Sequence, residues 1–138
     1  MDNFFASIYY YTNGLYSQEL DNYLFDIVPG YLHVGLAMVV ISVLFTIVFY
    51  YTLKPVRKQW LIWFLCLGLN SLINLILAVW YSYTPIINNE IDASVAWTLT
   101  DCFGFGIANI IWSIATVLVA SLLIKWWSPA KYIPFKKF

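Results

Sequence analysis

Residues 54–59 read Lys54-Pro55-Val56-Arg57-Lys58-Gln59, a short basic turn between two long apolar runs. Pro55 ends the preceding helix, because proline has no N–H to donate and its ring crowds the previous turn. Lys54, Arg57 and Lys58 are costly to move across a bilayer, so we expect them to stay on the cytoplasmic side. The turn therefore predicts a helical hairpin in a membrane and gives its direction.

The composition also indicates an integral membrane protein. The 138 residues are 62% hydrophobic and 10% charged, whereas soluble domains are about 25% charged. The formal net charge is zero, which argues against nucleic acid as a partner because such binding needs a basic field. The length allows one transmembrane domain and no second globular domain.

Hydrophobic runs predict an all-α integral membrane protein with three transmembrane helices, at about 31–53, 60–81 and 95–127. Residues 1–30 precede them as an aromatic-rich segment of one or two short amphipathic helices at the outer interface. Residues 128–138 form a basic cytoplasmic tail, in which cations and rings alternate as on an anionic leaflet. The last span is longer than a ~30 Å hydrocarbon core requires, so it must tilt or project.

Local signals suggest where the shorter elements begin and end. Ser17 is a candidate N-cap for a second short helix, with Asp21 in the first turn, where the helix dipole favours anions. An outer loop is expected from 82 to 94. Asp92 or Ser94 could cap the helix that follows it.

Small and polar side chains share one face of each predicted span, which favours close helix contacts and interhelical hydrogen bonds. Asn70 and Asn74 lie one turn apart, and an amide in hydrocarbon must find a partner. We expect one of them to face Asn109 or Ser113 of the third span. The candidate residues for helix packing or partner contact are Gly35, Ser42, Thr46, Asn70, Asn74, Asp101, Gly104, Asn109, Ser113 and Thr116.

Charged residues fall into two groups along the chain. Every Asp and Glu lies before residue 27 or between 90 and 101. Three spans place these acids on the side opposite the cations, which predicts an outside N-terminus and a cytoplasmic C-terminus, in a bacterial inner membrane. The residues expected to set this topology or to lie at the membrane surface are Lys54, Arg57, Lys58, Lys125, Lys131, Lys136 and Lys137.

Few residues in the sequence are suited to catalysis or to binding an ion. Asp101 is the one acid that could lie inside a span, which makes it a candidate for an ion-related or partner-pairing role. His33 is the only histidine and is expected at the outer interface. Cys66 and Cys102 are expected toward opposite ends of the spans and therefore not to pair. Without metal-ligand spacing, a glycine-rich phosphate loop or a nucleophile beside a base, we expect a protein that is not an enzyme and uses no metal or cofactor.

Three helices packed alone can satisfy only part of their small and polar faces, so we expect neighbouring proteins in the membrane. We interpret the chain as a non-catalytic subunit or anchor, whose partners are the lipid bilayer and other membrane subunits or further copies of itself. The arrangement of spans also resembles one class of phage holins, with three spans, an outside N-terminus and a basic cytoplasmic tail. That resemblance implies a self-oligomerising pore-former and carries no residues across, and the long aromatic N-terminal segment departs from the compact holin form. A membrane immunity protein that blocks a toxin is a further alternative.

Overall fold

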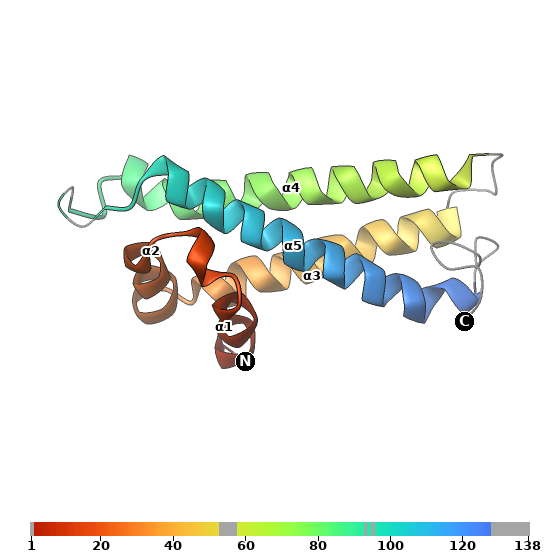
Figure 1. The fold of residues 1–138 in the computed structure, drawn as a ribbon, viewed down its shortest axis with the longest axis horizontal. Helices are drawn as coiled ribbons and strands as arrows, with labels where there is room; N and C mark the ends of the chain where they lie inside the picture. The colour runs from red at the N-terminus through yellow and green to blue at the C-terminus, as the bar shows by residue number, and fades with distance from the viewer. Residues whose placement is uncertain (1, 53–57, 93, 95, 128–138) are drawn as a thin grey trace.

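The computed structural model describes residues 2–52, 58–92, 94 and 96–127. Within these ranges every regular element is a helix, and three long helices form an elongated bundle (Figure 1). Shorter helices precede the bundle and pack against it. The predicted fold class, an all-α protein with three long apolar helices after short ones, is confirmed.

The long helices are α3 (Gly30–Ile47), α4 (Gln59–Ile87) and α5 (Leu99–Ile124). A π-helical turn, η3 (Val48–Thr52), continues α3, and a 3-10 turn, η4 (Lys125–Trp127), continues α5. With these turns the three helices contain 23, 29 and 29 residues, and each is long and apolar enough to cross a membrane. We call the end where α3 and α5 begin the outer end, and the opposite end the inner end.

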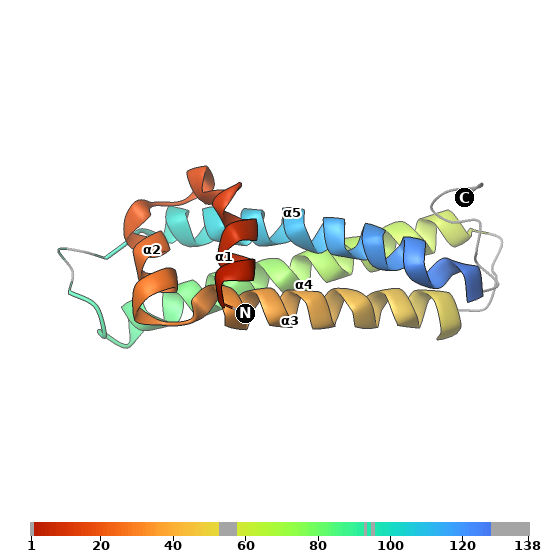
Figure 2. The ribbon, with the colours of Figure 1, turned by 90° about the horizontal axis from the view of Figure 1, so that it is seen from below.

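The N-terminal segment, residues 2–29, lies against the outer half of the bundle. Figures 1 and 2 show α1 crossing α3 and α5 rather than running parallel to them. As predicted, Ser17 caps the second α-helix, and its hydroxyl accepts the backbone N–H of Leu20 at 3.5 Å. The elements of this segment are α1 (Asp2–Tyr10), η1 (Asn13–Leu15), α2 (Gln18–Asn22) and the π-helical η2 (Tyr23–Ile27).

The second span is longer than its sequence suggested. α4 continues through Pro85 to Ile87, so the outer loop begins after Ile87 and not at residue 82. Pro85 lies in the last turn of α4, and helical hydrogen bonding resumes after it, because the Asn88 N–H donates to the Thr84 carbonyl at 3.0 Å. The Thr84 hydroxyl also donates to the Trp80 carbonyl at 2.7 Å, which adds a bond in the affected turn.

The third span begins later than expected, at Leu99, and Thr98 caps it in place of Asp92 or Ser94. The Thr98 hydroxyl accepts the Asp101 N–H, and the Asp101 carboxylate accepts the Thr98 N–H at 2.8 Å. This reciprocal pair is a capping box, which satisfies two backbone donors at once.

Candidate functional site

Hydrogen-bonded side chains run through the interior of the bundle and join the three long helices. Asn109 on α5 donates from Nδ2 to the Asn74 carbonyl at 2.9 Å. Asn74 in turn donates to the Asn70 carbonyl at 2.9 Å, and Ser42 on α3 donates to Asn70 Oδ1 at 3.3 Å. All four side chains are fully buried. The structure therefore brings Asn74 and Asn109 together, and it adds α3 to the contact.

Tyr9 of the N-terminal segment extends this polar chain. Its hydroxyl donates to Asn109 Oδ1, and its ring stacks on Tyr31 with the centroids 5.1 Å apart. Burial raises the pKa of Tyr9 well above its usual value, so the hydroxyl stays a donor. Sequence reasoning missed Tyr9, because one tyrosine among many in an interfacial segment gives no sign that it faces the protein. The available signal was its helical spacing from Phe5, which is also buried.

Two glycines let the N-terminal segment approach the long helices closely. A Cβ atom at Gly104 would lie 1.9 Å from the carbonyl oxygen of Leu15, and one at Gly35 would lie 2.3 Å from the Phe5 ring. The small-residue faces of α3 and α5 are thus covered, at these two positions, by the same chain.

The other hydroxyls on the predicted faces bond mainly within their own helices. Thr46 donates to the Ser42 carbonyl at 2.8 Å, and Ser113 donates to the Ile110 carbonyl at 2.9 Å. Thr116 donates to the carbonyl one turn earlier at 2.8 Å. These residues are buried or partly buried, so they form part of the interior but do not link α5 to α4.

The charged candidates are dispersed. Asp101 lies in the first turn of α5, where its carboxylate serves the capping box. At the inner end Lys58 is exposed, whereas Lys125 is buried with its Nζ 5.0 Å from the centroid of the Trp126 ring. The remaining candidates, which lie outside the described residues, are Lys54, Arg57, Lys131, Lys136 and Lys137.

The histidine and the two cysteines belong to no metal-binding group in the part of the chain that the structure describes. His33 is exposed, and its Nδ1 lies 2.8 Å from the Tyr81 hydroxyl, which ties α3 to α4 near the outer end. Cys66 and Cys102 are free thiols. Among the residues that the structure describes, no three His, Cys, Asp or Glu side chains are grouped to hold a metal ion.

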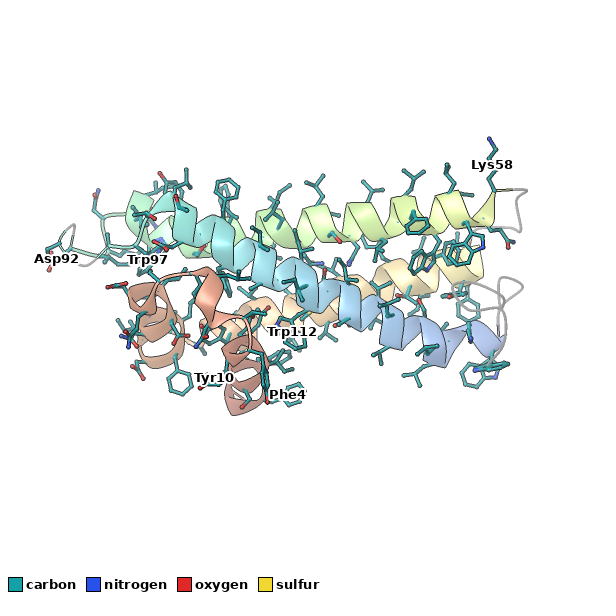
Figure 3. The ribbon with its side chains drawn as sticks, in the orientation of Figure 1. Phe4, Tyr10, Lys58, Asp92, Trp97 and Trp112 are labelled. Carbon is teal, nitrogen blue, oxygen red and sulfur yellow. The ribbon has the colours of Figure 1, made fainter. Side chains whose placement is uncertain are left out.

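The outer end carries an exposed surface of rings, aliphatic side chains and carboxylates. Phe25 is 58% exposed and Ile27 72% exposed. The exposed carboxylates of this surface are those of Glu19, Asp26, Glu90 and Asp92. Figure 3 shows Asp92 and Lys58 at opposite ends of the molecule, so the described part of the chain is polarised in charge along its length.

Two hollows open on different faces of α2 and η2. One, of about 360 Å³, is lined by Ala6, Ser7, Tyr10, Asp21, Phe25 and Tyr31. The other, of about 390 Å³, is lined by Glu19, Asn22, Tyr23, Ile27, Glu90, Ile91, Asp92 and Trp97. Burial, with the Glu90 carboxylate, raises the pKa of Tyr23 in the second hollow. Both hollows combine rings with carboxylates, a lining suited to cationic ligands.

No protein-family model, curated protein or solved structure matches the chain. The fold itself defines the class, which is a helical membrane protein with three spans and an N-terminal segment packed on their outer half.

Proposed function

We propose that the chain is a non-catalytic subunit or anchor that joins a larger membrane assembly through its outer end. The observation that supports this proposal is a contrast between the interior and the outer surface. Most of the polar and small residues that could have bound a neighbour within the membrane are buried in the chain's own packing. The outer end instead exposes rings beside carboxylates, and exposed apolar groups rimmed by polar ones are typical of interaction sites.

The faces of the long helices that point away from the bundle suit contact with lipid rather than with protein. Exposed side chains along them are large and apolar, as hydrocarbon requires. Representative members on the three helices are Leu36, Val40, Leu44, Leu65, Leu69, Leu72, Ile76, Ile107, Ile111 and Leu123. The spans would therefore anchor the protein, and recognition would fall to the outer end.

The charge distribution supports an orientation for this anchor. The described lysines lie at the inner end and the exposed carboxylates at the outer end. Placing the cations in the cytoplasm puts the N-terminal segment and its exposed surface outside, in a bacterial inner membrane.

A self-assembling pore is the second candidate, and the packing disfavours it. The residues on α5 that would line a water path include Asn109 and Ser113, and both are 0% exposed. A pore would need these helices to separate and break the contacts with Tyr9 and Asn74. An immunity protein would block a toxin within the membrane, so the identity of the bound chain separates that role from a subunit.

Gentle extraction from the native membrane, followed by native mass measurement and identification of the bound chains, tests the proposal. Foreign membrane chains in fixed stoichiometry are the expected result. Replacing Ile27 and Ile87 together by Ala should release them, because both side chains are exposed at the outer end. The matched control Leu72→Ala, on the lipid face of α4, should retain them. Self-oligomers alone, together with ion leakage from reconstituted vesicles, would overturn the subunit role and favour the pore.

A further inference from the structure

The smaller of the two hollows at the outer end has the features of an ammonium site. It lies between α1, the α2–η2 helix and the first turn of α3, and it measures about 360 Å³. Its lining combines one carboxylate with aromatic rings. Rings surrounding a positive charge attract it through their negative faces, most strongly where water is partly excluded. The lining residues are Ala6, Ser7, Tyr10, Asp21, Phe25 and Tyr31.

The carboxylate of Asp21 is held in place by a buried hydrogen-bond relay. Tyr31, only 3% exposed, donates its hydroxyl to Asp21 Oδ1, and the Tyr16 hydroxyl lies 2.8 Å from that of Tyr31. Burial raises the pKa of Tyr16 above its usual value, so that phenol stays protonated even in alkaline solution. A carboxylate has about four acceptor positions, so lone pairs remain for a ligand beside the Tyr31 hydroxyl.

The chain provides no lysine or arginine to neutralise this carboxylate within the described region. The first Lys or Arg in the sequence is Lys54. The described lysines, Lys58 and Lys125, lie at the inner end, as Figure 3 shows for Lys58. An anion lined by rings and remote from the chain's own cations is complementary to an external cation.

We propose that this hollow binds the ammonium headgroup of a zwitterionic phospholipid, with Asp21 as countercharge and the Tyr10 and Phe25 rings as the cation–π surface. The location selects a lipid as the source of the ammonium group. Tyr31 is in the first turn of a membrane-spanning helix, and an amphipathic segment packed there lies in the headgroup layer. The inference goes beyond the proposed function, because it assigns a lipid ligand and not a protein partner.

Native mass spectrometry of the full chain in detergent, titrated with lipids of identical acyl chains, tests this site. The probes are phosphatidylcholine, phosphatidylethanolamine and phosphatidylglycerol, of which the last has no ammonium group. We expect the first two to bind about tenfold more tightly than the third. Asp21→Asn, which keeps an acceptor for Tyr31, should remove that preference. Phe25→Leu, at a side chain that is 58% exposed, should weaken it several-fold.

Asp26→Asn is the matched control, because Asp26 is an exposed carboxylate of the same helix that does not line the hollow. It should keep the preference of the unmodified chain. Equal binding of all three lipids, or an equal loss in Asp26→Asn and Asp21→Asn, would overturn the site. Choline chloride binding as tightly as phosphatidylcholine would overturn the lipid assignment and identify a free amine as the ligand. Thermal unfolding of each variant checks its fold, and if Asp21→Asn unfolds, Phe25→Leu decides the question.

Discussion

The outer and inner halves of the bundle are held together by different kinds of contact. In the outer half, side chains of separate elements pair through specific hydrogen bonds. Trp97 donates to the Ser82 carbonyl at 2.9 Å, and Trp112 donates to the Thr12 hydroxyl at 3.2 Å, in addition to the bond from Tyr9. Each bond requires one partner in one position, so the bonds of Tyr9 and Thr12 fix the N-terminal segment against α5, and the bond from Trp97 fixes the outer loop against α4.

In the inner half, the described contacts between elements are mainly ring packing, and the buried cluster is smaller than the one in the outer half. Phe49, Tyr50 and Trp63 form its buried cluster, and the centroids of the first two rings lie 4.9 Å apart in an edge-to-face arrangement. α3 changes there to the π-helical η3. Apolar packing accepts a change of shape more readily than a buried hydrogen bond accepts the loss of its partner. The comparison therefore predicts that substitutions are more costly in the outer half.

The largest expected effect comes from adding one methyl group to the outer half. Gly104→Ala places its Cβ against the Leu15 carbonyl oxygen, which belongs to the backbone and cannot rotate away. We expect a loss of about 3 kcal/mol, or detachment of the N-terminal segment, seen as a lower unfolding midpoint and faster proteolysis before residue 30. Gly68→Ala is the matched control, since no atom lies within 4 Å of its Cβ position. It should stabilise α4 by up to about 1 kcal/mol, and equal losses in both variants would refute the comparison.

Removing the central amide should have the next largest effect. Asn109→Leu leaves the Tyr9 hydroxyl without its partner and removes the bond from α5 to the Asn74 carbonyl, at an expected cost of about 2 kcal/mol in reversible unfolding. Ser113→Ala removes a bond that lies within one helix and should cost about 0.5 kcal/mol or less. A double-mutant cycle with Tyr9→Phe should give a coupling of about 1 kcal/mol, and additive losses would show that the two side chains act independently.

High pH provides a test that needs no change in packing volume. Burial raises the pKa of Tyr9 and Tyr16 above that of the unfolded chain, so the folded state retains protons that the unfolded state releases. Stability should be intact below about pH 10 and fall above it, by about 1.4 kcal/mol per pH unit for each tyrosine. Unfolding midpoints measured in detergent between pH 9 and 11 would show this slope. Tyr9→Phe should reduce the slope, and an unchanged slope would exclude Tyr9 from the linkage.

The sequence predicted local features well and tertiary ones poorly. The presence of three long apolar helices and the Ser17 cap depend on neighbouring residues, and both were apparent in the pattern, whereas the outer ends of the second and third spans were not. The glycines at 35 and 104 were also visible as close-contact positions, but periodicity does not tell which chain fills the space. Only the structure shows that the N-terminal segment fills it, with Phe5 of α1 at Gly35 and Leu15 of η1 at Gly104. The same limit hid Tyr9, whose bond to Asn109 connects residues 100 positions apart.

The smallest effect should come from the exposed cap at the start of α5. The Thr98-x-x-Asp101 spacing of a capping box was present in the sequence, although earlier polar residues in the loop competed with it as caps. Thr98→Ala removes the side-chain acceptor of the Asp101 N–H and should cost about 1 kcal/mol, with faster amide exchange in the first turn. Thr100 is exposed and lies two residues after Thr98. Thr100→Ala should be neutral or slightly stabilising, because alanine favours a helix. Water can replace this exposed cap, but it cannot reach the buried Asn109, so Thr98→Ala should cost less than Asn109→Leu. A larger cost for Thr98→Ala would contradict the view that buried polar contacts hold the outer half together.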